Sequence, residues 1–312
     1  MKCKLDDAAV LMGMGIRGTS LIASKSGYFN RFRDIMNKRL CILHANCQGE
    51  PLLARLNASP EFTDQYECRI ITNYTREAIP DGLLERCDLF LYQYLNANWG
   101  ELASDTLLGK LKTDCKSLCI PNMFFAGYWP FWNGKPGFNY RCTHLDDIIN
   151  MGLPDEETVL LYLRSNLSQK FDLNALLHQT IAQEQQREAH TPIKYVDIIE
   201  NEHGQHRLFN TVNHPNARLM DHAATEVLRH LGMTPPDRAV LDALGDPFPE
   251  FEQPINPHIA AHFGWPFGGA DAQYNVYGIP MSHARYVANY VSCQKAGIED
   301  FIGYLQGEYR ES

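Results

Sequence analysis

Short apolar segments alternate with amphipathic segments along the first half of the chain. The apolar segments are rich in Leu, Ile, Phe and Tyr, as is typical of buried strands, and the segments between them have apolar residues at helical spacing. The predicted strands cover 40–43, 68–74, 87–94 and 117–125, and the predicted helices cover 51–56, 79–87 and 102–111. This alternation predicts an α/β fold in which a parallel sheet lies between two layers of helices.

The second half of the chain has a mostly helical pattern. Residues 126–140, reading AGYWPFWNGKPGFNY, are predicted to form an aromatic loop. Helices are expected over 155–165, over 171–189 behind Asp172 as N-cap, and over 282–306, whereas 193–199 fits a strand or a helix.

A strand-to-helix boundary also occurs late in the chain, in the run RLFNTVNHPNARLM. An apolar strand edge leads to His214, Pro215 and Asn216, and the apolar residues that follow are spaced for one face of a helix. His214 is therefore expected at the end of an element. Asp221 and His222, in that helix, are expected to be surface or capping residues.

These patterns suggest three parts of the chain. Residues 1–37 are expected to be a peripheral or weakly ordered extension, because the α/β pattern begins only at residue 38. Residues 38–235 would form the α/β catalytic domain, and 236–312 a helical C-terminal extension packed on it. The apolar run near the N-terminus is interrupted by Arg17 and is too short for a membrane span, so we expect no membrane insertion.

Charge and cysteine content limit the classes of binding partner and the cellular compartment expected for this chain. The net charge of −9, without any basic run, argues against nucleic acid and favours small molecules or proteins. The nine cysteines are too sparse and irregular for a disulfide framework, which indicates a reducing, cytoplasmic location. Cys115 and Cys119 near His144 lack a second ligand pair, and His258 and His262 lack a further ligand, so no metal is expected.

The run LCILHANCQGEPLL places Cys47 between the first strand and its helix. Asn46 supplies turn chemistry and Gly49 backbone freedom, and the helix N-terminus is expected to lower the pKa of the Cys47 thiol. Ligands bind at the carboxyl ends of parallel strands, where Tyr74, Gln93, Asn96 and Asn122 would join Cys47. The alternative is that Cys47 is a small buried apolar residue.

Together these residues could form an acyl-transfer site. Cys47 would be the nucleophile, His214 the base, and Gln48, Gln93 and Asn96 would join the Cys47 N–H in holding the oxyanion. His283 is the second choice of base. The candidate cofactor contacts are His44, Asn46, Asn122 and Tyr128. For His44, packing or hydrogen bonding at the strand end is favoured over a role in the site.

The order of these elements resembles the SGNH, or GDSL-type, hydrolases. Those enzymes have a nucleophile after the first strand and a late histidine followed by proline, but here Cys47 replaces the serine and Thr211 the expected acid. HANCQGEPL, LYQY and NHP together more closely resemble the WcbI-type capsular polysaccharide biosynthesis proteins, from about Lys38 onward. That resemblance implies coenzyme A binding and O-acetyl transfer from acetyl-CoA to a deoxyheptose-type sugar, in a pathway that serves capsule-dependent virulence.

Several alternatives remain open from the sequence. His214 could activate the sugar hydroxyl directly, without an acyl-enzyme. The same Cys47 and His214 could serve a carbohydrate esterase or a thioesterase, because the sequence does not reveal whether water is excluded. A sugar-nucleotide-binding accessory protein with an inert Cys47 is the third possibility.

Overall fold

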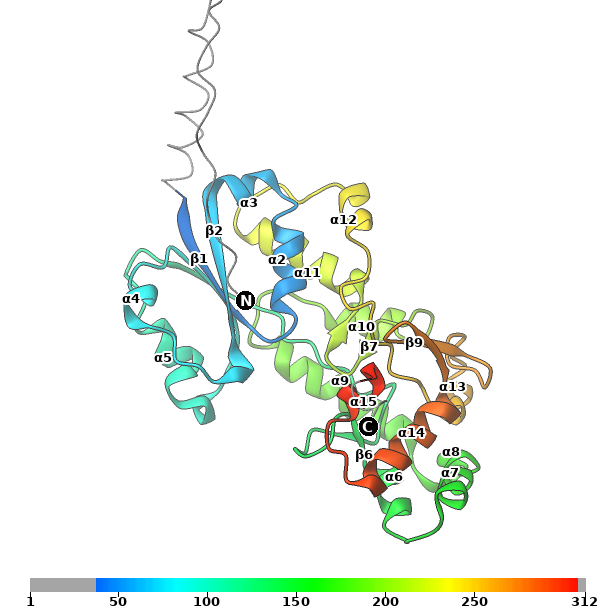
Figure 1. The fold of residues 1–312 in the computed structure, drawn as a ribbon. Coiled ribbons are helices and arrows are strands. Elements are labelled where there is room, and N and C mark those ends of the chain that lie inside the picture. The colour runs from blue at the N-terminus through cyan, green and yellow to red at the C-terminus, as the bar shows by residue number, and fades with distance from the viewer. Residues whose placement is uncertain (1–37, 308–312) are drawn as a thin grey trace, which may run out of the picture. The chain divides into compact units, whose positions relative to one another are not determined.

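Four parallel strands form the central sheet of the computed structural model, which describes residues 38–307 (Figure 1). The strands are β1 (Arg39–Ala45), β2 (Tyr66–Thr72), β3 (Leu89–Gln93) and β4 (Lys116–Ile120), in the order β2-β1-β3-β4. The register aligns Cys41 of β1 with Cys68 on one side and Leu89 on the other. The parallel sheet predicted from the apolar segments is confirmed.

Alternate side chains of the strands face two different helical layers. Ile42 and Phe90 pack in a core with α4 (Asp81–Leu84) and α5 (Ser104–Leu108). Leu43 and Leu91 pack on the other face, where α2 (Gly49–Leu56) and α11 (Ala217–His230) lie side by side (Figure 1). Burying one large aliphatic side chain contributes about 2 kcal/mol, so the period-two pattern of these strands determines which residues face each layer.

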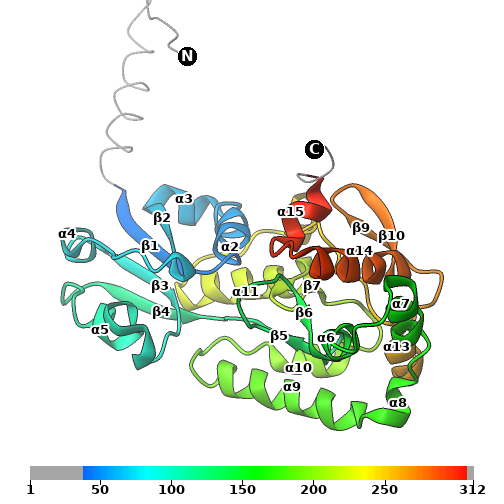
Figure 2. The same cartoon turned by 60° about the horizontal axis from the view of Figure 1, so that its bottom comes forward.

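A second core joins the middle of the chain to its C-terminal part. It is formed by residues such as Leu145, Tyr162, Tyr290 and Phe301. These residues belong to α6 (Thr143–Ile149), α7 (Asp155–Leu163), α14 (His283–Ala296) and α15 (Phe301–Gln306), which gather in one region of Figure 2. The boundary between 235 and 236 stays a prediction, and the expected extension 1–37 lies outside the described residues.

The remaining elements are short, apart from α9. The helices are α3 (Pro60–Gln65), α8 (Leu167–Lys170), α9 (Leu173–Glu188), α10 (Val196–Glu202), α12 (Arg238–Leu244), α13 (Pro257–Phe263), η1 (Asn73–Thr75) and η2 (Ala97–Leu102). The strands are β5 (Trp132–Asn133), β6 (Arg141–Cys142), β7 (Phe209–Thr211), β8 (His214–Pro215), β9 (Gln273–Val276) and β10 (Ile279–Ser282). None of the helices within 38–307 is long and apolar enough to cross a bilayer.

Three local expectations need correction or refinement. The helix predicted over 282–306 is two helices, because Gly297 adopts φ 71° and ends α14 with a left-handed cap. Residues 196–199 of the ambiguous segment 193–199 belong to α10, and no part of the segment is a strand. Gly49 is required by close packing, since a Cβ there would lie 3.1 Å from the Ala45 Cβ, and not by a special backbone angle.

A buried ion pair connects α2 to α11. The Arg55 Nε donates to Asp221 Oδ1 at 2.6 Å, and the two side chains are 2% and 4% exposed. A further guanidinium nitrogen of Arg55 donates to the Gly245 carbonyl at 2.8 Å, while Arg238 also pairs with Asp221. Asp221 is therefore not the surface or capping residue expected from the sequence, because its partners come from distant segments.

Arg55→Met should destabilise the protein strongly. Removing Arg55 leaves the buried Asp221 with only the exposed Arg238 as a charged partner, and we expect the free energy of unfolding to fall by about 3 kcal/mol in urea denaturation. Arg229→Met is the matched control, because it breaks an exposed pair with Glu226 inside α11 and should cost less than about 0.5 kcal/mol. Equal losses in the two variants would contradict a stabilising role for the buried pair.

Candidate active site

Cys47 lies in a tight turn between β1 and α2, at the carboxyl edge of the sheet. Asn46 shapes this turn, since its side-chain oxygen accepts from the Gln48 N–H at 2.9 Å and its carbonyl from the Gly49 N–H at 2.9 Å. The short polar side chain therefore supplies the turn chemistry predicted for it. The turn presents Cys47 in a half-buried position.

The side chain of Gln93 ties this turn to the neighbouring strands. Its carbonyl oxygen accepts from the Asn46 N–H at 2.8 Å, and its NH₂ group donates to Gln48 Oε1 at 3.2 Å and to the Pro121 carbonyl at 3.0 Å. Gln93 is 1% exposed, so these bonds form away from water. Removing either partner would leave a buried polar group unsatisfied.

Gln48 continues the same network toward a later part of the chain. Its NH₂ group donates to the Met123 carbonyl at 2.7 Å and to the Asn213 carbonyl at 2.9 Å, and its oxygen accepts from the Met123 N–H. The side-chain NH₂ group of Gln48 therefore donates to two acceptors within the protein, and so does that of Gln93. The two side chains position the site, and the expected oxyanion contacts from them do not fit this geometry.

Asn213 is the side chain that contacts the Cys47 sulfur. Its Nδ2 donates to Cys47 Sγ at 3.4 Å, while its Oδ1 accepts from the Thr211 hydroxyl at 3.1 Å and so sets the orientation of the amide. The sequence interpretation missed this residue. The available signal was its place directly before His214, at the same strand-to-helix boundary.

His214 lies in the same pocket as Cys47. It belongs to β8, which pairs with β7, and Asn216 then caps α11 by accepting from the Leu219 N–H. The imidazole stacks on Phe248 with ring centroids 4.2 Å apart and an angle of 6° between the planes. Burial lowers the pKa of His214 to about 4, so the ring is neutral near pH 7 and able to accept a proton.

The Cys47 thiol is protonated at neutral pH, contrary to the expectation of a lowered pKa. Burial raises the pKa of Cys47 to about 11, against hydrogen bonds from the backbone N–H groups of Cys47 and Gln48, which lower it. The loss of hydration outweighs those contacts at the start of a two-turn helix. The site therefore combines a neutral thiol with a neutral imidazole.

The pocket around these residues has a volume of about 550 Å³, within the range of small-molecule sites. Carboxylates dominate its charge, from Glu50, Asp246 and Glu250. Tyr74, which follows β2, also lines it and is 61% exposed. Such a lining offers hydrogen-bond acceptors and an aromatic face.

Three other residues that the sequence placed at the site do not line the Cys47 pocket. Asn96 accepts from the Asn98 N–H and lines a separate pocket with Asn122, so it is not placed to hold an oxyanion at Cys47. Asn122 nevertheless accepts from Asn46 Nδ2 at 3.1 Å. His44 is 1% exposed and stacks on Phe90 inside the sheet core, which fits the packing alternative rather than a cofactor contact.

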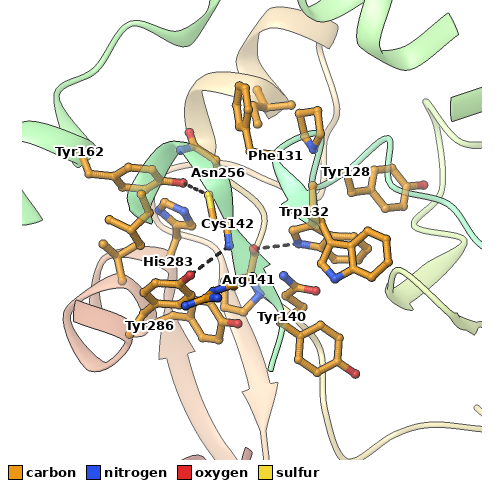
Figure 3. Close-up of a pocket in the computed structure, with 18 residues that line it drawn as sticks. Tyr128, Phe131, Trp132, Tyr140, Arg141, Cys142, Tyr162, Asn256, His283 and Tyr286 are labelled. Carbon is orange, nitrogen blue, oxygen red and sulfur yellow. Dashed lines mark hydrogen bonds between the residues drawn. The ribbon is translucent and has the colours of Figure 1, made fainter. Parts of the chain in front are cut away.

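Tyr128 and His283 line a different pocket from the one that Cys47 lines (Figure 3). Its volume of about 50 Å³ suits one or two water molecules rather than a substrate. The Tyr128 hydroxyl lies 3.0 Å from the carbonyl oxygens of His203 and His206, so its role is structural. His283 does not line the pocket of Cys47, whereas His214 does.

Metal ligation finds no support in the described part of the chain. Within it, no group of three or more His, Cys, Asp or Glu side chains is arranged to hold a metal ion. Cys119 instead lies at the buried end of β4, and His144 stacks among aromatic rings beside Phe131.

Comparisons with known proteins extend these observations. The sequence profile described as "Polysaccharide biosynthesis enzyme WcbI" matches residues 40–236. Among solved structures, the chain is similar to a WcbI protein described as a novel polysaccharide biosynthesis enzyme, without a disulfide bond between coenzyme A and a cysteine. The TM-score is 0.69 at 19% identity, over 88% of this chain and 96% of the other, which shows a shared fold. No curated protein sequence matches significantly. The profile match covers more than half of the chain, which therefore belongs to the WcbI family of polysaccharide biosynthesis enzymes.

Proposed function

We propose that this chain is an O-acyltransferase that moves an acetyl group from acetyl-CoA to a hydroxyl of a capsular sugar. Cys47 is the nucleophile and His214 the base. The observation that carries the proposal is that one pocket is lined by both residues, which come from distant strand-to-helix boundaries. The description of the related WcbI structure, which names coenzyme A and a cysteine, supports this choice of donor.

In the first half-reaction, Cys47 Sγ attacks the thioester carbonyl of acetyl-CoA while His214 accepts the thiol proton. A new C–S bond forms, and the carbonyl electrons move to oxygen. The intermediate then collapses, the bond to the coenzyme A sulfur breaks, and His214 returns the proton to that sulfur. The products are acetyl-Cys47 and free coenzyme A.

In the second half-reaction, His214 accepts the proton of the sugar hydroxyl as its oxygen attacks acetyl-Cys47. Collapse of this intermediate breaks the bond to Cys47 Sγ, which regains a proton from His214. The sugar leaves as an acetyl ester. A neutral His214, which its lowered pKa supports, is the state required at the start of both half-reactions.

Asn213 is the side chain proposed to stabilise the oxyanion. Its amide donates to Cys47 Sγ at 3.4 Å, so it lies beside the atom to which the reacting carbonyl becomes attached. The backbone N–H of Cys47 is the natural second donor, because the Gln48 N–H is already used by Asn46 Oδ1. Removing one donor of such a site typically lowers kcat by about 10²-fold or more.

A covalent acetyl adduct on Cys47 is the first expected result. After mixing with acetyl-CoA and acid quenching, peptide mass spectrometry should find acetylation at Cys47, and His214→Ala should slow its formation by about 10³-fold or more. Cys115→Ala is the control, because that half-buried cysteine lies at the amino end of β4.

The outcomes of this experiment also separate the alternatives. Full transferase activity in Cys47→Ala would exclude the acyl-enzyme and favour direct transfer. Acetate release that is equally fast with and without a sugar acceptor would favour a hydrolase. If Cys47→Ala and His214→Ala both behave like the unmodified protein, the proposed enzyme is wrong and a binding role stands.

The reactivity of Cys47 toward iodoacetamide should rise steeply with pH. Because burial raises the pKa of Cys47 to about 11, the thiolate fraction should increase roughly tenfold per pH unit between pH 7 and 10. A short unstructured cysteine peptide, with an ordinary thiol pKa of about 8.5, should level off at about pH 9.5 in the same assay. A plateau for Cys47 below pH 8 would contradict the raised pKa.

A further inference from the structure

A second open pocket lies at the carboxyl ends of β3 and β4, beside α9. Its volume is about 610 Å³, and its lining includes Tyr94, Asn96, Trp99, Asn122, Arg187 and His190. The hydrogen bond between Asn46 and Asn122, 3.1 Å long, links it to the Cys47 pocket, because Asn46 lines one pocket and Asn122 the other. Since the sheet order is β2-β1-β3-β4, the two pockets adjoin opposite halves of the same edge.

The two pockets differ in charge. Three carboxylates line the Cys47 pocket, and the Arg55 guanidinium that also reaches it is already used by Asp221 and the Gly245 carbonyl. The residues that line the second pocket, all of them within the described range, include no carboxylate. They do include Arg187, whose side chain is 42% exposed. A polyanion is therefore disfavoured beside Cys47 and better accommodated in the second pocket.

Arg187 lies on an aromatic ring of the second pocket, with its guanidinium 4.7 Å from the centroid of the Phe124 ring. Arg76 does not line the pocket, but its guanidinium lies 4.5 Å from the centroid of the Trp99 ring, which does. Arg187 also pairs with the buried Glu184. Burial raises the pKa of Glu184 to about 7, so this carboxyl only partly neutralises Arg187 near neutral pH.

Flat rings and amides complete the lining. Tyr94 and His190 stack in parallel with centroids 3.7 Å apart, and Trp99 is half-buried. Stacking on aromatic side chains favours purine bases, and amide side chains such as Asn96 and Gln186 can pair with the edges of a base. Aromatic planes, amides and arginines together are the chemistry that recognises a purine nucleotide.

We propose that this second pocket binds the adenosine 3′,5′-bisphosphate end of the acyl donor. The pantetheine arm then passes the Asn46–Asn122 pair to reach Cys47, and the acid-lined pocket is left for the sugar. This inference rests on the proposed function for its donor. It adds the place of the nucleotide and the separation of donor and acceptor on the sheet edge.

Calorimetric titration of the full-length protein with coenzyme A and with adenosine 3′,5′-bisphosphate tests the assignment. Trp99→Leu removes the half-buried ring and Arg187→Gln the cation, and each should weaken the binding of both ligands by about tenfold or more. Arg218→Gln is the charge-matched control, because Arg218 is exposed, pairs with Glu202 and does not line this pocket; its affinities should be unchanged. Thermal melts identify any variant that fails to fold, and Trp99→Leu keeps the test decisive if Arg187→Gln exposes the Glu184 charge.

The two possible failures are distinguishable. If the unmodified protein binds coenzyme A and becomes acetylated at Cys47 while both folded variants bind as tightly as it does, the nucleotide site is wrong and the proposed function stands. If the unmodified protein binds neither coenzyme A nor the bisphosphate, both proposals fall. Equal weakening in Arg218→Gln would show that only overall charge matters and would also overturn the site.

Discussion

Two buried amide side chains, Gln48 and Gln93, form the interaction on which the candidate site depends. Gln93 links the Cys47 turn to the end of β4, and Gln48 links that turn to the Met123 and Asn213 segments. Inside a protein, each lost partner of such a network leaves a desolvated polar group that costs about 1–3 kcal/mol. The network therefore holds Cys47 and the segment that carries Asn213 and His214 in one arrangement.

Burial has opposite and complementary effects on the two reacting groups. It raises the pKa of Cys47 and lowers that of His214, so both are uncharged before substrate binds. A neutral pair costs less to bury than a thiolate–imidazolium pair. In the proposed reaction, charge develops only after substrate binds, beside the Asn213 amide, which is where preorganised donors are most effective. The acidic lining of the pocket is also compatible with a neutral thiol, because a thiolate would be repelled by Glu50 and Glu250.

Much of the fold could be predicted from the sequence because it depends on local patterns. The apolar runs and their spacing predicted all four strands and the helices α2, α4 and α5 between them, but not α3. The strand-to-helix boundaries predicted that Cys47 and His214 lie at the ends of elements. The pairing of Arg55 with Asp221, the contact from Asn213 and the full use of the Gln48 amide depend on segments distant in sequence. The spacing of apolar residues along the chain does not predict contacts between such distant segments. The pKa of Cys47 was mispredicted for the same reason, since desolvation is a property of the packed structure.

The central claim is that Gln48 acts by holding Asn213 against Cys47 and not by touching the oxyanion itself. A double-mutant cycle of Gln48→Met and Asn213→Ala, read as the rate of Cys47 acetylation by acetyl-CoA in variants that retain their fold, tests this most directly. If Gln48 works through Asn213, the double variant should be no slower than the slower single variant, which corresponds to a coupling of about 1 kcal/mol or more. Fully additive losses would show that the two residues act independently and would contradict the account.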